Sequence, residues 1–287
     1  MTTVSPAAIL QELESRTPQK KTDKGRRLIT QDKKPNPVLV GVLRLLVIGI
    51  VFGGWELGAK LGAVNVFFWS SPSLILAKAV QQFGAGTLID DLVFTLTSAV
   101  LGFLLGTILG TALGMSFWWS NTYGKTVEPF VVMFEAIPKL ALAPIVVLVL
   151  GIGIESKIAM ATGMVMAVQA LNAAAGARTV DRDVVRMLNS LGASRGKIFR
   201  SVVIPSTLPW IISGLRVTIG LALAGAIVGE FIGSDKGLGR LIVYAGSVYD
   251  IALIWVGVFV LALLSIALYL IVGFTERRLS HSIAATR

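Results

Sequence analysis

Side chains that could carry out a chemical reaction are few in this sequence, and they lie far apart. Hydrolysis within a membrane needs a nucleophile with a base, or a metal cluster. The only histidine is His281, close to the C-terminus, and the 287 residues include no cysteine. The absence of cysteine also excludes a disulfide framework and a thiolate metal site. The sequence therefore disfavours an intramembrane hydrolase, and we predict no catalytic residue and no metal ligand.

One short motif matches part of a nucleotide-binding loop. Gly124-Lys125-Thr126 fits the end of the pattern Gly, four residues, Gly-Lys-Ser/Thr, whose backbone cradles phosphates. The first glycine of that pattern falls at position 119, which is Trp119. Because the phosphate-binding loop is incomplete, any nucleotide is expected to act from another chain.

Acidic side chains deep in a membrane are typical of transporters that are coupled to an ion gradient. The candidates here are Glu56, Glu135 and Glu230, and each lies near one end of an apolar segment. Their position disfavours an ion-coupled secondary transporter, which stays the alternative of another class.

Several polar or polarisable residues within apolar segments are candidates for lining a solute pathway. Pro138 and Pro144 each remove a backbone donor, and such breaks are tolerated at membrane depth only where protein or a water-filled cavity covers them. Structural roles are the alternative: an ion pair at the cytosolic interface, amides that join helices, and charged anchors near the membrane surface. The pathway candidates are Glu135, Lys139, Met164, Gln169, Asn172, Arg216 and Glu230.

The composition places these residues in a membrane protein. Hydrophobic residues make up 54% of the chain, charged residues make up 15%, and the mean hydropathy is +0.78. Soluble domains carry about 25% charged residues. A helix crosses a bilayer with about 20 apolar residues, so we predict an all-α polytopic protein with six transmembrane helices. The expected spans are Val38 to Leu61, Leu92 to Trp118, Val127 to Leu150, Lys157 to Ala177, Ile211 to Ile232, and Leu253 to Phe274.

The basic residues outside the spans predict the orientation. If the N-terminus is inside, the inner segments hold 18 lysines and arginines and the outer segments hold five. Positive loops stay in the cytosol, so both termini are expected there. Four parts are predicted in order: residues 1–37 as a flexible basic tail, 38–61 as an extra N-terminal helix, 62–279 as the core, and 280–287 as a cytosolic tail.

A stripe of glycines occurs in the second span. At four-residue spacing, successive helical turns lack side chains on one face, which lets another helix approach closely. Helix packing is the expected role, and a hinge or a subunit interface is the alternative. The stripe consists of Gly102, Gly106, Gly110 and Gly114.

A highly charged stretch between the fourth and fifth spans has its own helix signals. Asp181 and Asp183 suit a helix start, and Gly192 supplies a C-terminal break. Ser194 can cap a second helix, which Pro205 is expected to end. Six basic residues against two acids make the stretch net positive, which suits acidic headgroups or an acidic protein groove. DNA binding fits poorly, because both ends of the stretch are tethered to membrane spans.

The spacing within this stretch resembles the cytoplasmic loop of ABC-importer permeases. That family's pattern is Glu-Ala-Ala, three residues, Gly, nine residues, Ile-x-Leu-Pro. In this chain Gly192 is followed after nine residues by Val202-Val203-Ile204-Pro205. The chain departs from the pattern at Arg186-Met187-Leu188, which stand where Glu-Ala-Ala is expected. The glycine and the spacing are kept, and they carry the geometry.

Other motifs resemble one branch of these permeases, which transports nitrate, sulfonate, taurine or bicarbonate. The resemblance covers roughly residues 70–279. The motifs are Pro138-Lys139-Leu140-Ala141-Leu142-Ala143-Pro144, Gly151-Ile152-Gly153, and Gly229-Glu230-Phe231-Ile232-Gly233-Ser234 with Gly237-Leu238-Gly239.

This resemblance implies a type I importer permease in the bacterial inner membrane, working as a homodimer or with a second permease chain. ATP and Mg²⁺ would bind to separate ATPase subunits, so the chain itself would be no enzyme and hold no cofactor. A periplasmic or lipid-anchored binding protein would deliver a small anion, or alternatively a thiamine precursor or an aromatic acid. Loop 178–210 would hold the coupling helices. The residues implied in coupling are Arg186, Leu188, Leu191, Gly192, Ala193, Ser194, Arg195, Lys197 and Pro205.

Overall fold

The computed structural model describes the backbone of residues 36–285 and the side chains of residues 36–278. Every regular element in this part of the chain is helical. Five helices are long and apolar enough to cross a membrane, which confirms the prediction of an all-α polytopic protein. The predicted basic tail lies almost wholly outside the described residues. The five helices are α2 (Pro37–Lys60), α5 (Thr87–Ser116), α8 (Ile154–Arg178), α11 (Ile204–Ile232) and α13 (Ile251–Ala285).

The expected third span, with its two prolines, consists of two helices. α6 (Asn121–Ala136) and α7 (Lys139–Leu150) are bent by 91° at the break between them. Ile137 is extended there, with ψ 129°, because the ring of Pro138 disfavours a helical residue before it. Pro144 lies inside α7 and does not end it. Counted as one broken span, the pair brings the possible crossings to six.

Shorter helices connect the long ones. Ser71 caps α4 by accepting a hydrogen bond from the Leu74 N–H at 3.4 Å. Each of the other short helices follows a loop of glycine or polar residues that interrupts the apolar sequence. The short helices are α3 (Val66–Trp69), α4 (Pro72–Gly84), α9 (Arg182–Ser190), α10 (Arg195–Ile198) and α12 (Leu238–Ser247).

The chain divides at Gly53 into two units, which are described separately. The described part of the first unit, residues 36–53, is the beginning of α2. Arg44 is its only charged residue, so its composition is that of a membrane span. The second unit begins at Gly54 and contains all the other helices.

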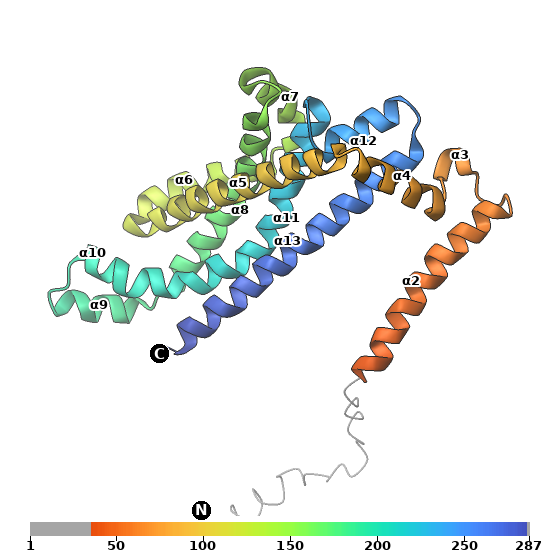
Figure 1. Ribbon diagram of the computed structural model, residues 1–287. Coiled ribbons are helices and arrows are strands. Elements are labelled where there is room, and N and C mark those ends of the chain that lie inside the picture. Colours follow the sequence, from red (N-terminus) through yellow and green to blue (C-terminus); the bar gives the residue numbers. More distant parts are fainter. Residues whose placement is uncertain (1–35, 286–287) are drawn as a thin grey trace, which may run out of the picture. The chain divides into compact units, whose positions relative to one another are not determined.

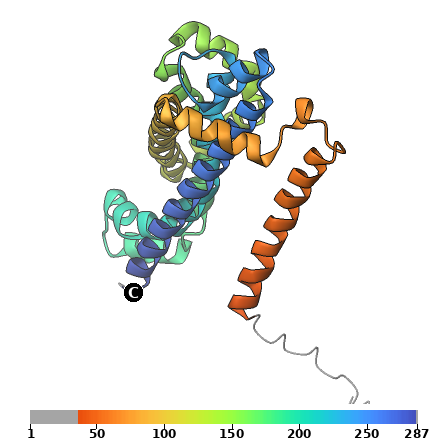
Figure 2. The ribbon, with the colours of Figure 1, turned by 45° about the vertical axis from the view of Figure 1, so that its right-hand side comes forward.

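The core of the second unit lies where α5, α8 and α11 pack together, with α13 against α11 and α12. Figure 1 and Figure 2 show α9 and α10 at one end of this bundle and α7 and α12 at the opposite end. The C-terminal end of α13 lies at the end that α9 and α10 form. We call these the loop end and the α12 end of the bundle.

The glycine stripe of α5 is buried against α8. A Cβ atom on Gly110 would meet the carbonyl oxygen of Met166, and one on Gly114 would meet that of Ala170. Backbone atoms of a packed helix cannot move aside as a flexible side chain can. The stripe therefore allows the close approach of the two helices, as small residues do in membrane bundles.

Replacing Gly114 with alanine should destabilise the bundle, because the added methyl group meets backbone. Overpacking costs about 1–3 kcal/mol, and the melting temperature of the purified protein in detergent should fall. Gly220→Ala in α11 is the matched control, because nothing lies within 4 Å of a Cβ at that position. Equal melting temperatures for the two variants would contradict the packing role.

Candidate functional site

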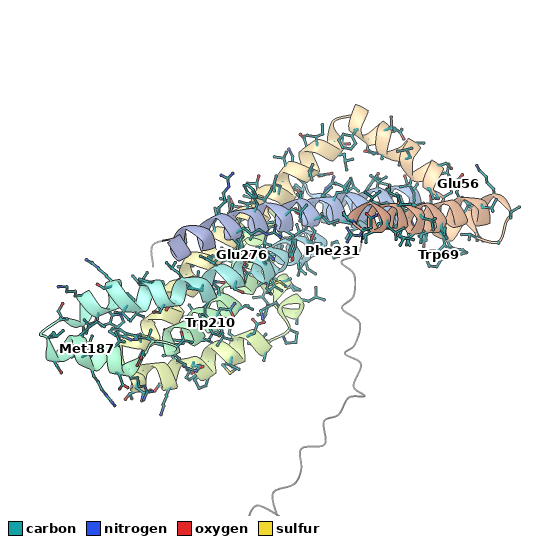
Figure 3. The ribbon with its side chains drawn as sticks, turned by 90° about the horizontal axis from the view of Figure 1, so that it is seen from below. Glu56, Trp69, Met187, Trp210, Phe231 and Glu276 are labelled. Carbon is teal, nitrogen blue, oxygen red and sulfur yellow. The ribbon has the colours of Figure 1, made fainter. Side chains whose placement is uncertain are left out.

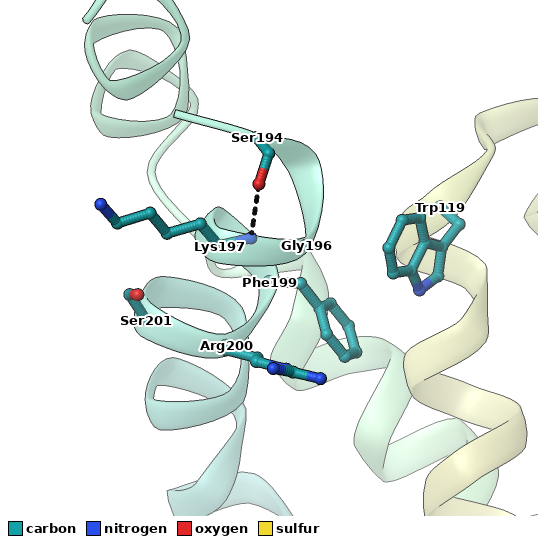
Figure 4. Close-up of a pocket in the computed structure, with 7 residues that line it drawn as sticks. All are labelled: Trp119, Ser194, Gly196, Lys197, Phe199, Arg200 and Ser201. Carbon is teal, nitrogen blue, oxygen red and sulfur yellow. Dashed lines mark hydrogen bonds between the residues drawn. The ribbon is translucent and has the colours of Figure 1, made fainter. Parts of the chain in front are cut away.

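The charged stretch between α8 and α11 folds into two capped helices. Asp181 caps α9, and its side chain accepts a hydrogen bond from the Asp183 N–H at 2.8 Å. Ser194 caps α10, and its Oγ accepts a hydrogen bond from the Lys197 N–H at 3.4 Å, as Figure 4 shows. Both helix starts predicted from the sequence are confirmed. We call residues 181–203 the capped loop.

Gly192 ends α9 in the left-handed conformation, with φ +80°. The Gly192 N–H donates to the Asn189 carbonyl at 3.0 Å, and the Ala193 N–H donates to the Leu188 carbonyl at 3.0 Å. This pair of bonds is the Schellman motif, which satisfies the last carbonyls of a helix. Nothing lies within 4 Å of a Cβ placed on Gly192. The backbone conformation, and not a lack of space, therefore requires glycine here.

Pro205 does not end the second helix, so that prediction is wrong. α10 continues into a π-helical turn, Phe199–Val203, in which the Ile204 N–H donates to the Phe199 carbonyl. Pro205 follows in the first turn of α11, where a missing N–H is tolerated. A π turn accommodates an extra residue within a helix and is frequent at functional sites. The capped loop is thus joined to α11 by continuous helical backbone, 38 residues from Arg195 to Ile232.

Phe199 on the π turn contacts the end of α5. A 3-10 turn, Phe117–Trp119, extends α5 at the loop end. The ring centroid of Phe199 lies 5.5 Å from that of Trp118 and 5.3 Å from that of Trp119. In Figure 4 the Phe199 side chain faces Trp119 beside a cavity of about 660 Å³, and the Lys197 side chain points away from Trp119. The capped loop therefore contacts α5 through aromatic rings and continues into α11 through the backbone.

Apolar side chains on the capped loop are exposed. Met187 is 57% exposed and Leu191 is 75% exposed, and Figure 3 shows Met187 projecting from α9 at the far loop end. Exposed apolar residues on an otherwise charged helix indicate an interaction surface. All the predicted coupling residues except Pro205 lie in α9, in α10 or in the turn between them.

The pathway candidates do not come together at one site. Glu135 and Lys139 form an ion pair at 2.9 Å across the break between α6 and α7. Arg216 on α11 forms an ion pair with Glu276 on α13. These contacts match the structural alternative that the sequence left open for such residues.

The candidates on α8 are buried or half-buried between helices. Gln169 is fully buried, and its Nε2 donates to the Ile211 carbonyl at 3.2 Å. The amide therefore joins α8 to α11, the usual role of a polar residue in a membrane helix. Met164 and Asn172 are half-buried on the same helix.

Glu230 lies in a buried polar cluster at the α12 end of the bundle. Its side chain is 1% exposed, and its two carboxylate oxygens accept hydrogen bonds from the Thr95 hydroxyl at 2.8 Å and the Gly239 N–H at 2.7 Å. Asp91 accepts a hydrogen bond from the Gly237 N–H at 2.7 Å. Both carboxylates thus accept hydrogen bonds from N–H groups at the start of α12, where N–H groups without a partner in the helix carry partial positive charge. The alternative role of Glu230 as an exposed charged anchor is wrong, because the side chain is buried.

Lys157 is a cation at the α12 end of the bundle, and it is fully buried, with 0% exposure. Its Nζ donates to the Ile152 carbonyl at 2.7 Å, to the Ser156 hydroxyl at 3.2 Å and to the Gly233 carbonyl. Ile152 follows α7 and Gly233 follows α11, so the ammonium lies where two helix C-termini converge. Carbonyls at such ends carry partial negative charge.

Sequence reasoning missed Lys157 and Asp91 because each lies at the edge of an expected span. Lys157 is the first residue of the expected fourth span, and Asp91 falls one residue before the expected second span. A sequence signal was present for Asp91, since Thr95 follows one helical turn later. Lys157 had no such signal, because two of its three partners are backbone carbonyls.

Solved structures of ABC transporters contain chains with the same fold. A chain of the MetNI methionine ABC transporter matches with a TM-score of 0.60 at 19% identity, over 69% of this chain and 97% of that chain. A chain of a bacterial ABC transporter that imports the acidic polysaccharide alginate gives 0.59 at 17% identity, over 84% of this chain and 95% of that chain.

Residues 102–283 match the family described as binding-protein-dependent transport system inner membrane component, and the chain belongs to this family. The riboflavin transport system permease protein of Chloroflexus aurantiacus is 35% identical over 240 residues, 84% of this chain and 89% of the relative. The taurine transport system permease protein of Escherichia coli is 28% identical over 243 residues, 83% and 88% of the two chains. The predicted ABC-importer permease fold is confirmed, and the chain is a multi-pass inner membrane protein.

Replacing Lys157 with methionine should lower the stability of the permease. The apolar side chain fills similar space but leaves buried carbonyls without a donor, which costs about 1–3 kcal/mol for each unsatisfied group. A fall in the melting temperature of the detergent-purified protein is expected. Lys236→Met is the control, because Lys236 has a side chain that is 59% exposed and its ion pair with Asp90 spans 4.0 Å. A melting temperature of Lys157→Met equal to that of the control would argue against this role.

Proposed function

We propose that this chain forms, as a homodimer, the pathway of a type I ABC importer, and that the capped loop is the docking site for a separate ATPase subunit. ATP and Mg²⁺ bind to that subunit, and ATP hydrolysis takes place there. A solute-binding protein delivers the solute at the α12 end. The loop end and both termini lie in the cytosol, as the basic residues of the loops predict.

The capped loop is the observation that carries this proposal. It presents exposed apolar and basic side chains at one end of the bundle, and helix caps and the left-handed turn at Gly192 fix its shape. Its backbone continues without a break into α11, so a displacement of the loop acts directly on a membrane helix. A partner that closes on the loop would thereby move the bundle. The family description, which names a binding protein, supports the external partner.

The proposed solute is a small anion of the nitrate, sulfonate, taurine or bicarbonate kind. The motifs around Pro138 and Glu230 support this class, as do relatives named for the transport of taurine and of aliphatic sulfonates. An aromatic solute is the second candidate. It is favoured by the relative named for riboflavin and by the formylaminopyrimidine transport permease protein of Halalkalibacterium halodurans, which is 30% identical over 212 residues, 74% of this chain and 84% of the relative.

A purified complex tests the proposed function. Extraction of the tagged chain in a mild detergent should bring with it a nucleotide-binding subunit. Proteoliposomes that hold the complex and the binding protein should take up solute only with ATP and Mg²⁺. Uptake that proceeds without ATP, or a chain that never co-purifies with an ATPase, would sink the proposal.

Replacing Gly192 with valine should abolish ATP-driven uptake while leaving membrane insertion intact. A β-branched residue in the left-handed region is strained, since this conformation costs an ordinary L-residue roughly 1–2 kcal/mol. The turn between α9 and α10 is then expected to rearrange. Gly192→Asn is the conservative variant, because asparagine tolerates this conformation, and it should retain uptake in the same assay. Normal uptake by the valine variant would count against coupling through this turn.

A further inference from the structure

A cavity of about 870 Å³ opens between α6 and α9 at the loop end of the bundle. From α6, its lining includes Asn121, Lys125 and Glu128, which are spaced by four and three residues and so share one face of that helix. From α9 it includes Arg182 and Arg186, which also share a face. Two helix faces that are far apart in the sequence thus confront each other across this space.

Positive charge prevails in the cavity. Glu128 is the only carboxylate among the described residues of its lining, and it forms an ion pair with Arg178 from the end of α8. Arg186 lies 3.3 Å from Asp183, but their side chains are 78% and 86% exposed, so solvent screens this pair. The other two cations of the lining, one on each wall, have no ion-pair partner among the residues that the structure describes. The cavity therefore offers cations to a ligand that carries negative charge.

The floor of the cavity is apolar. Phe117 and Val180 are buried there, and Trp118 and Val185 are half-buried. Trp119 follows at the same end of α5, and tryptophan is enriched where a membrane meets water. Exposed cations at the rim of this buried apolar floor match an amphiphile with a charged head.

We propose that this cavity binds the phosphate group of an acidic phospholipid, with Lys125 and Arg182 as its principal ligands. Guanidinium and ammonium groups are the side chains that recognise phosphate. Basic pockets between transmembrane helices on the cytosolic side are sites for acidic headgroups, so the inference rests on the proposed orientation of the loop end. A free phosphate ion could bind the cations of the rim in the same way, but it has no apolar part to contact the apolar floor. The lipid would tie α9 to α6 and so hold the capped loop against the broken span.

Lipid binding to the full-length chain, purified in mild detergent with the subunits that accompany it, tests this inference. The probes are phosphatidylglycerol, phosphatidylcholine and inorganic phosphate, and native mass spectrometry counts the molecules that stay bound. Phosphatidylglycerol should bind at least tenfold more tightly than phosphatidylcholine. The double variant Lys125→Gln/Arg182→Gln should bind phosphatidylglycerol roughly twenty-five-fold more weakly, because each basic side chain near a headgroup contributes about a factor of five.

The control is the double variant Lys197→Gln/Arg200→Gln, which removes the same charge from the same end of the bundle, outside this cavity. It should bind phosphatidylglycerol as the original chain does. Equal losses in the two double variants would overturn the proposal, because they would indicate attraction by net charge alone. Phosphate binding without lipid binding would overturn the lipid as the source, and binding of neither would overturn the site.

Melting temperatures of the unliganded variants, measured alongside, identify a folding defect. If Lys125→Gln/Arg182→Gln melts lower, the single variant Lys125→Gln should still show a roughly fivefold loss, and an unchanged affinity in it would overturn the proposal. Neither ATP nor transport enters the assay. Its failure is therefore distinct from a failure of the proposed import function.

Discussion

The absence of water inside a bilayer is the constraint on which the rest of this structure depends. A polar group there must find its partner within the protein, and the bundle meets this requirement at specific points. Gln169 joins α8 to α11. Lys157 donates hydrogen bonds to carbonyls that follow α7 and α11, and Glu230 accepts one from an N–H at the start of α12. The bonds from Gln169 to Ile211 and from Lys157 to Gly233 link residues that are 42 and 76 positions apart in the sequence. The requirement to satisfy buried polar groups therefore also holds the helix ends in place.

Close helix packing supplies the other part of the framework. The glycine stripe lets α5 lie directly on the backbone of α8, and a Cβ on Gly225 of α11 would lie 2.7 Å from the Cα of Ala161 on α8. Without space between backbones, these three helices cannot slide past one another independently. They form a rigid unit, and the capped loop is continuous with it through α11.

Local signals in the sequence predicted much of this architecture, and non-local contacts account for what they missed. Caps at Asp181 and Ser194 and the break at Gly192 depend on neighbouring residues, so their residue types were sufficient evidence. The spans followed from hydropathy in the same way. The burial of Lys157 and Glu230 depends on loops that only the folded bundle brings near. The helical path through Pro205 depends on a π turn that no residue type predicts. The functions of the coupling and pathway candidates remain predictions.

The break at Ile137 has a mechanical consequence within this framework. Lys157 links the end of α7 to the end of α11 by hydrogen bonds. At the α12 end, α7 is therefore held to the unit of α5, α8 and α11. α6 lies on the other side of the 91° bend, and its ion pair of Glu128 with Arg178 is partly exposed to solvent. The backbone is extended only at Ile137 and Pro138 between the two helices, so these two residues set the angle between α6 and α7. Val131 on α6 is buried against Ala167, Ala170 and Ala174 of α8. The bend therefore lets one broken span be anchored at both ends, by apolar packing at α6 and by the buried ammonium of Lys157 at α7.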